Sequence, residues 1–212
     1  MFHKSWIPLR KWFWAIFLMA TSKKGMSMLY LQGQLGIGSY RTVWLMGHKI
    51  RKAMEQRDAQ YTLKGPVQAD EVFIGGKQTL EERRKFGTNK TPFFSGVEEG
   101  PKATPRFVTF QELEKVWEEH VLPAIEKNNE KGSTIKANGA AHYSAAEKKT
   151  GYGHQRSIAM NDPKKTAEHL KWVNMLTSNL KRFLLSTYHG VFPKYHSAYL
   201  AEFALTESER VP

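Results

Sequence analysis

Cysteine is absent from this 212-residue sequence. Its absence excludes disulfide bonds, cysteine-ligated zinc sites and a thiol nucleophile within the chain. A long apolar run is also missing, because the best candidate, residues 12–20, is far shorter than the roughly 20 residues that a membrane-spanning helix needs. No internal repeat and no low-complexity tract is present. The length suits either one large domain or a small domain followed by a medium one.

Acidic residues are fewer than basic residues. The chain has 32 Lys+Arg against 20 Asp+Glu, a formal net charge of +12. Residues 1–60 contain ten Lys or Arg and two acids, so this stretch alone carries +8. A partner that carries phosphates is the simplest explanation of such a surplus, and an anionic membrane surface is the alternative.

The apolar run at residues 12–20 follows several basic residues and superficially resembles a signal peptide. It contains Trp12 and Trp14, and two lysines, Lys23 and Lys24, come soon after it. We therefore interpret the run as a core helix, with a signal peptide as the alternative.

Residues 27–54 have the pattern of a helix, a short glycine-containing turn and a second helix. Ser27 is placed to cap a helix that ends near Leu35, and the second helix is expected over residues 40–54. The second helix should bury one apolar stripe, made of Val43, Met46, Ile50 and Met54. Its other sides carry the candidate DNA-binding residues Arg41, His48, Lys49, Arg51 and Lys52. Residues 1–60 are thus predicted to form a helix-turn-helix DNA-binding region. An ordinary helical hairpin with a solvated basic face is the alternative.

Residues 67–77 read as a buried strand that carries an acid and ends at two glycines. Asp70 and Glu71 should lie on opposite faces, because successive side chains of a strand alternate. A carboxylate within an apolar strand must be paired, neutralised or bound to metal, since an isolated buried charge is too costly. The alternative is a strand end with two solvated acids.

The rest of the chain predicts a mixed α/β domain over residues 61–212. A charged loop is expected at residues 77–90, and strands at 92–97, 105–110, 133–137 and 155–159. Helices are expected at residues 112–128, 141–149 and 167–186. In the last of these helices Asn174 and Lys181 share one stripe beside the core stripe, because they are seven residues, about two turns, apart.

Together these stretches resemble the bacterial insertion-sequence transposases that have an RNase H-like catalytic core. The resemblance is to the ISXO-like branch, in which two Asp are followed by Asn, Glu or His and by a Lys seven residues later. It covers nearly the whole chain. It is carried by residues 11–16, 31–37, 48–54, 70–77, 178–183 and 187–190.

The resemblance implies an RNase H-like mixed sheet flanked by helices and preceded by a helix-turn-helix. It implies metal-dependent cleavage and strand transfer of DNA, with two Mg²⁺ (or Mn²⁺) ions roughly 4 Å apart. Asp70 matches the first Asp, Asn174 the third ligand, and Lys181 the Lys that meets DNA phosphate. The implied partners are transposon terminal repeats, target DNA and further copies of the chain, and the implied location is cytoplasmic and nucleoid-associated, with no membrane.

The second Asp of the pattern falls on Asn138, which replaces a carboxylate by a neutral amide. Asp70 would then be the only charged member of the metal-ligand set Asp70, Asn138 and Asn174. The final residues of the chain also depart from the helix and Arg/Asn-rich tail with which the family usually closes. A catalytically inactive, DNA-binding relic of a transposase is therefore the alternative function, and a basic protein of the membrane surface is a third.

Overall fold

The central element of the structure is a mixed β-sheet. The computed structural model describes residues 2, 5–75, 81, 84, 90–157 and 168–208, and their strands are β1 (Pro66–Ile74), β2 (Thr91–Glu99), β3 (Pro105–Glu112), β4 (Thr134–Ala137) and β5 (Gly153–Arg156). The spatial order is β3-β2-β1-β4-β5. Strand β2 runs antiparallel to both of its neighbours, β1 and β3, whereas β4 is parallel to β1 and β5 is parallel to β4.

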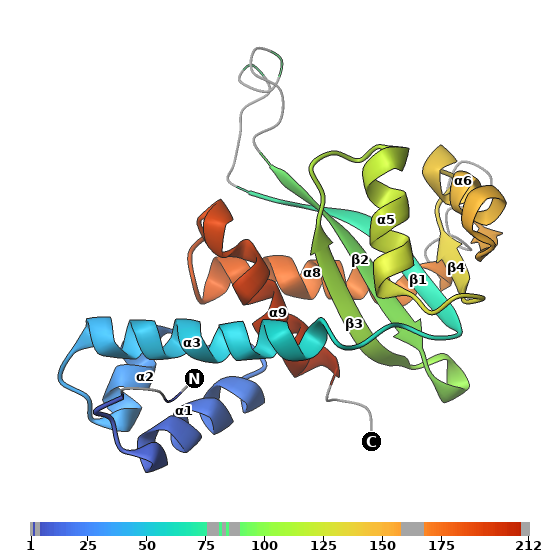
Figure 1. Ribbon diagram of the computed structural model, residues 1–212. Coiled ribbons are helices and arrows are strands. Elements are labelled where there is room, and N and C mark those ends of the chain that lie inside the picture. Colours follow the sequence, from blue (N-terminus) through green and yellow to red (C-terminus); the bar gives the residue numbers. More distant parts are fainter. Residues whose placement is uncertain are drawn as a thin grey trace.

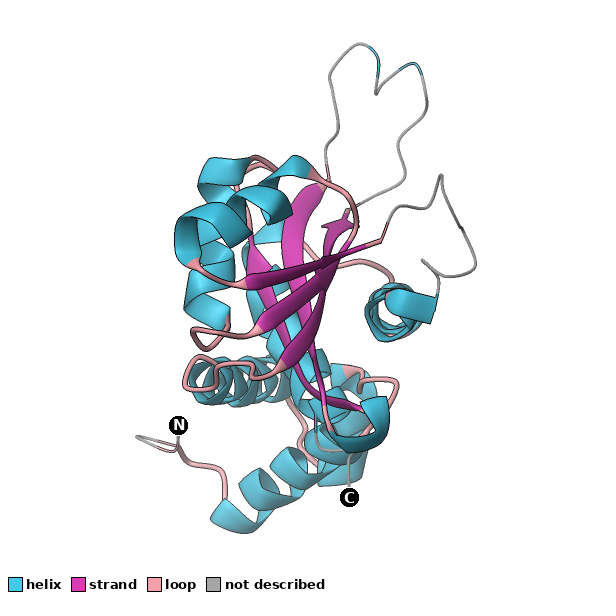
Figure 2. Ribbon diagram, turned by 90° about the vertical axis from the view of Figure 1, so that its right-hand side faces the viewer, coloured by secondary structure: helices cyan, strands magenta, loops and turns pink. Residues whose placement is uncertain are grey.

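Helices cover both faces of this sheet (Figures 1 and 2). One face carries α5 (Glu118–Asn128) and α6 (Ala141–Thr150). The other carries α8 (Lys171–Ser186) and α9 (His196–Ser208). Short 3-10 turns, η1 (Pro101–Ala103) and η2 (Pro193–Tyr195), precede β3 and α9. This mixed sheet flanked by helices confirms the predicted α/β, RNase H-like fold class.

The strand β1 divides its side chains between the two apolar cores. Val67 and Ala69 are buried in the core under α5 and α6, whereas Val72 and Ile74 are buried in the core under α8 and α9. The alternation follows from the two-residue period of a strand. It confirms that β1 is covered on both faces.

The N-terminal helices are α1 (Leu9–Thr21), α2 (Met28–Leu35) and α3 (Tyr40–Asp58). Ser27 caps α2 by accepting a 3.2 Å hydrogen bond from the amide of Tyr30, as predicted. Gly36 ends α2 with a left-handed φ of 56°, and Ser39 then caps α3. The predicted helix, turn and helix are all present, and α3 continues four residues past Met54 to Asp58.

Helix α1 differs from the core helix that the sequence predicts. Trp12, Ala15 and Met19 are buried as expected. The opposite side is apolar but remains 49–60% exposed, at Leu9, Phe13, Trp14 and Phe17. The prediction holds for one face only. Among the helices that the structure describes, none is both long and apolar enough to cross a bilayer.

The predicted helix over residues 112–128 starts later than expected. Glu112 is still part of β3, where it pairs with Phe93, and the amide of Leu113 donates to the carbonyl of Pro92 at 2.9 Å. These sheet contacts hold the first residues of the window in an extended path, so α5 begins only at Glu118.

Three of the predicted segments fall partly outside the described residues. These are most of the loop at 77–90, the end of the strand at 155–159 and the first residue of the helix at 167–186.

A buried ion pair joins the N-terminal helices to the sheet domain. Arg51 of α3 donates from Nε to Oε2 of Glu202 in α9 at 2.6 Å, and both side chains are fully buried. The hydroxyl of Tyr188 donates to the other carboxylate oxygen at 3.0 Å, and the Arg51 guanidinium lies 4.0 Å from the ring centroid of Tyr199. Burial alone would lower the pKa of Arg51, but the Glu202 carboxylate outweighs it and the net direction is upward, so Arg51 stays charged.

The apolar surroundings of this pair come from α9. Ala201 and Leu205 pack with α1, α2 and α3, while Leu200 and Phe203 pack with α8 and the sheet. Helix α9 therefore belongs to both cores at once, and Figure 1 shows it crossing between α3 and α8.

Breaking the buried pair should unfold the protein more easily. Glu202→Gln leaves the Arg51 charge buried without its counter-ion, and we expect a loss of about 3–5 kcal/mol in the free energy of unfolding. Urea denaturation measures this loss. The matched control is Glu130→Gln, which removes the exposed Lys64–Glu130 pair at 3.4 Å and should cost less than about 1 kcal/mol. If both variants lost the same free energy of unfolding, the buried pair would not stabilise the fold more than the exposed pair does.

Candidate functional site

The site begins with the side chains of β1 that face α8. Gln68 points to this face, because its Oε1 accepts hydrogen bonds from the backbone amides of Trp172 at 2.9 Å and Val173 at 3.2 Å. Asp70 is two residues further along β1 and therefore lies on the same face. Gln68 thus holds the start of α8 beside the strand that carries Asp70.

The register of the parallel strands brings Asn138 to Asp70. Gln68 pairs with Lys136 of β4, so two further residues along each chain place Asp70 and Asn138 at matching positions on the same face. The amide nitrogen of Asn138 lies 3.4 Å from Oδ1 of Asp70. Asp70 and Asn138, two residues of the predicted site, therefore lie in contact.

The orientation of the Asn138 amide is fixed by the backbone. Its Oδ1 accepts a 2.9 Å hydrogen bond from the amide of Ala140, which can only donate. The NH₂ group must then face Asp70. At this position Asn138 presents a hydrogen-bond donor to Asp70, and its one oxygen is already engaged.

Asp70 is an unusual carboxyl group. Its pKa is raised to about 6, first by burial and then by the negative charge of Glu71. A hydrogen bond from the backbone of Glu71 and the charges of Lys181 and His142 act in the opposite direction. The group therefore gives up its proton less readily than an exposed aspartate, and a bound cation would make ionisation easier.

Glu71 lies on the opposite face of the sheet from Asp70. Its Oε1 accepts from the hydroxyl of Tyr143 at 2.7 Å and lies 2.8 Å from Nε2 of His142, both in α6. Burial and the Glu71 charge raise the pKa of Tyr143 well above its usual value, so the hydroxyl keeps its proton and remains a donor. The prediction that Asp70 and Glu71 point to opposite faces is confirmed.

Asn174 and Lys181 lie on the exposed stripe of α8, beside the buried stripe of Val173, Leu176 and Leu180. The positive charge of Lys181 acts to lower the pKa of Asp70, against the larger upward effects of burial and of Glu71. The side chain of Asn174 is exposed and makes no hydrogen bond within the described residues. The structure thus brings Asn138 into contact with Asp70, whereas Lys181 acts on Asp70 through its charge. Asn174 shares the exposed stripe of Lys181 and has no side-chain hydrogen bond to Asp70 or Asn138 within the described residues.

The basic residues of α3 do not all face solvent. Arg41, Lys49 and Lys52 are exposed, as predicted. Arg51 is fully buried against Glu202, so its placement among the solvent-facing residues was wrong. His48 is half-buried, and its pKa is lowered to about 4 by burial and by the charge of Arg51. A neutral His48 cannot act as a cation toward phosphate at neutral pH.

Comparison with known proteins places the chain in a family. The sequence model of the ISXO2-like transposase domain matches residues 62–207. The chain belongs to this family. A similar solved structure is titled "CryoEM structure of simian T-cell lymphotropic virus intasome in complex with PP2A regulatory subunit B56 gamma", with 12% identity, a TM-score of 0.41, and coverage of 93% of this chain and 74% of that chain. A search of curated proteins finds no significant match.

DDE transposases such as this family generally use divalent metal ions. In this transposase domain the donor set does not fit a two-metal centre. Of the three predicted ligands, all of which the structure describes, Asp70 alone is a carboxylate, Asn138 offers an NH₂ group, and Asn174 is an exposed neutral amide. Hard divalent cations such as Mg²⁺ require oxygen ligands. Within the described residues, no group of three or more His, Asp or Glu is arranged to hold a metal.

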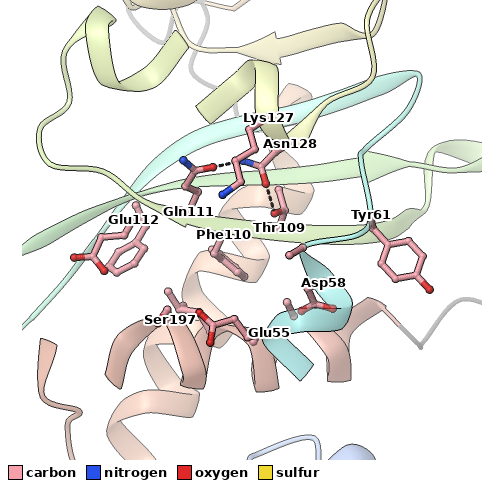
Figure 3. Close-up of a pocket in the computed structure, with 15 residues that line it drawn as sticks. Glu55, Asp58, Tyr61, Thr109, Phe110, Gln111, Glu112, Lys127, Asn128 and Ser197 are labelled. Atoms are coloured by element: carbon pink, nitrogen blue, oxygen red, sulfur yellow. Dashed lines mark hydrogen bonds between the residues drawn. The ribbon is translucent and has the colours of Figure 1, made fainter. Parts of the chain in front are cut away.

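A separate cavity of about 250 Å³ lies away from these residues of the transposase domain. Figure 3 shows that its walls come from α3, β3, α5 and α9. Glu55, Asp58 and Glu112 line it together with Lys127. Three carboxylates against one ammonium group disfavour a nucleic-acid phosphate, so we do not assign DNA binding to this cavity.

Two residues beside Asp70 were missed by the sequence analysis. Gln68 positions α8, and a polar residue two positions before Asp70 in an apolar strand was the signal that could have revealed it. Ser95 lies directly opposite Asp70 in β2 on the same face, and its buried hydroxyl has no hydrogen-bond partner within the described residues. No sequence signal marks Ser95, because its pairing depends on the register of β1 and β2.

The raised pKa of Asp70 makes a prediction about stability. The folded-state pKa of about 6 exceeds the ordinary value of 3.8, so the folded protein binds more protons between these pH values and loses stability as pH rises through them. Asp70→Asn, which cannot ionise, should therefore be more stable than the wild type at pH 7 by about 1–3 kcal/mol. Denaturant unfolding measures the difference, which should vanish near pH 3.5. A difference that is the same at both pH values would contradict the assignment.

Proposed function

We propose that this chain is a DNA-binding transposase-family protein that binds transposon-end DNA through residues 1–60 and holds an incomplete catalytic site around Asp70. The observation that supports DNA binding most directly is the exposed cationic surface of α3, formed by Arg41, Lys49 and Lys52. The helix-turn-helix arrangement of α2 and α3 supports it further, since such a second helix fits the major groove.

The catalytic part of the proposal rests on Asn138. In the proposed site Asp70 and Asn174 would be metal ligands and Lys181 would bind DNA phosphate. When bound, two divalent ions activate the attacking oxygen and stabilise the leaving oxygen in phosphoryl transfer. The NH₂ group of Asn138 occupies the place of a carboxylate oxygen, 3.4 Å from Asp70. We infer that this chain binds DNA and that its cleavage and strand transfer are impaired at this one position.

A catalytically active transposase is the second candidate. The electrostatic effect of Lys181 on Asp70 and the shared exposed stripe of Asn174 and Lys181 support it, since the family pattern has an Asn followed by a Lys at this spacing. Activity would then need a further group to complete the site.

Salt-dependent binding tests the DNA interface. We expect the protein to bind the terminal repeats that flank its coding sequence, with an affinity that falls steeply as salt rises, because phosphate contacts release counterions. The triple variant Arg41→Gln, Lys49→Gln, Lys52→Gln should reduce the slope of log K against log salt by up to about 3, at roughly 0.9 per contact. Filter binding measures both quantities.

The matched control replaces three exposed lysines elsewhere, Lys115, Lys131 and Lys148, by glutamine. It changes the net charge equally, so a purely nonspecific charge effect would lower both slopes alike. That result, or binding by the wild type that is indifferent to salt, would contradict the proposed interface.

The incomplete catalytic site is tested by Asn138→Asp. An aspartate at 138 would keep one oxygen on the amide of Ala140 and turn the other toward Asp70, which restores a second carboxylate at the site. We expect Mg²⁺- or Mn²⁺-dependent cleavage and strand transfer by the variant at least tenfold above the wild type. Adding Asp70→Asn to the variant should abolish the gain.

If the wild type and Asn138→Asp are equally active, the second candidate is correct and another group completes the site. If neither variant cuts DNA although both bind it, the loss of activity does not lie at Asn138 and the inactive-relic function becomes the better account.

A further inference from the structure

A second cavity, of about 510 Å³, lies between the N-terminal helices and the segment that links α8 to α9. Its size is within the range of roughly 300–1,000 Å³ that is usual for small-molecule sites. Its lining is dominated by aromatic side chains. These are Tyr40 and Trp44 of α3, Tyr188, Phe192 and Tyr195 of the linking segment, and Tyr199 of α9.

The inner rings of this aromatic pocket are packed and the outer rings are not. The ring centroids of Trp44 and Tyr195 lie 5.8 Å apart and those of Tyr188 and Tyr199 lie 4.6 Å apart, both pairs edge to face. These four inner rings therefore pack against one another in pairs. Phe192 is 75% exposed and Tyr40 is 49% exposed. Neither of these two makes a ring-to-ring contact within the described residues. The outer rings, those of Tyr40 and Phe192, therefore leave aromatic surface exposed to solvent.

The polar groups of the aromatic pocket suit a neutral or anionic ligand. His48 lies in its wall, and the buried Nε2 of this imidazole has no hydrogen-bond partner within the described residues. Lys194 contributes an ammonium group. Among the lining residues that the structure describes, none is acidic, in contrast to the cavity of Figure 3.

The pocket shares its wall with the proposed DNA-binding helix. Tyr40 and Trp44 are in the first half of α3, within one turn of the exposed Arg41 and about one and a half to two and a half turns before Lys49. A DNA backbone that follows the cations of α3 would pass the mouth of the pocket. Aromatic rings beside a cationic track are the combination by which proteins hold unpaired nucleotides, since every base has a face that can stack.

We propose that the aromatic pocket binds an unpaired nucleobase of the bound DNA, with Tyr40 and Phe192 stacking on the base and Lys194 contacting its phosphate. This inference rests on the proposed DNA binding by residues 1–60. It adds a ligand class, a single unstacked nucleotide at or next to the end of a duplex, that the cationic surface alone does not require.

The experiment compares two forms of one terminal-repeat DNA at the same salt concentration: a blunt duplex, and the same duplex with a short single-stranded extension that contains 2-aminopurine. We expect wild-type protein to bind the extended form more tightly than the blunt form by roughly 5- to 100-fold, the range for one stacked base. The 2-aminopurine fluorescence should fall on binding, because the base stacks on aromatic rings.

The exposed outer rings allow variants that leave the packed base of the pocket intact. Phe192→Ala and Tyr40→Ala should each remove most of the preference for the extended form and most of the fluorescence change, while blunt-duplex affinity stays within about twofold. The matched control is Trp117→Ala, an aromatic residue that is 56% exposed outside both proposed binding surfaces, and it should behave as wild type.

Equal affinity of wild-type protein for the two DNA forms would overturn the pocket assignment and leave the proposed DNA binding intact. A preference that survives both Phe192→Ala and Tyr40→Ala would overturn it as well. Failure to bind either form would overturn the proposed function and this inference together.

Discussion

The buried contact between Arg51 and Glu202 determines how the two parts of the molecule are joined. Two full charges without solvent exposure require each other, because neither could remain buried alone. Tyr188 and Tyr199 complete the surroundings of the pair, and α9 contributes apolar side chains to the helical core and to the sheet core. The cationic face of α3 is consequently held in a fixed relation to the face of β1 that carries Asp70, with the aromatic pocket between α3 and the segment before α9.

The site itself depends on strand register. Parallel pairing of β1 and β4 places residues 70 and 138 on one face at matching heights, where the side chain of Asn138 reaches Asp70. The backbone amide of Ala140 then selects which end of that side chain turns inward. A carboxylate at position 138 would turn an oxygen atom toward Asp70, whereas the amide of Asn138 turns its NH₂ group toward Asp70. The chemical character of the surface beside Asp70 therefore depends on which side-chain group residue 138 turns toward it.

Much of this arrangement could be predicted from sequence, because it depends on local periodicity. The alternation in β1 correctly placed Asp70 and Glu71 on opposite faces, and the seven-residue spacing correctly placed Asn174 and Lys181 on one stripe. The same periodicity wrongly predicted that Arg51 faces solvent. Its buried partner, Glu202, is 151 residues away, and no local pattern indicates that contact. The lowered pKa of His48 could not be predicted from sequence either, because it depends on burial against distant residues such as Tyr195 of η2 and Tyr199 of α9. Contacts between distant segments decide both cases.

The separation of Arg51 from Glu202 has a consequence during synthesis. The ribosome adds roughly 5–20 residues per second, so the arginine is made on the order of ten seconds before the carboxylate that neutralises it. During that interval the nascent helices have neither their counter-ion nor the apolar side of α9 to pack against. Co-translational folding can bury the sheet face under α5 and α6 first, whereas the opposite face and the contact with the N-terminal helices both wait for α9. Helices α1 to α3 are thus made before the sheet but reach their final place after its first face is covered.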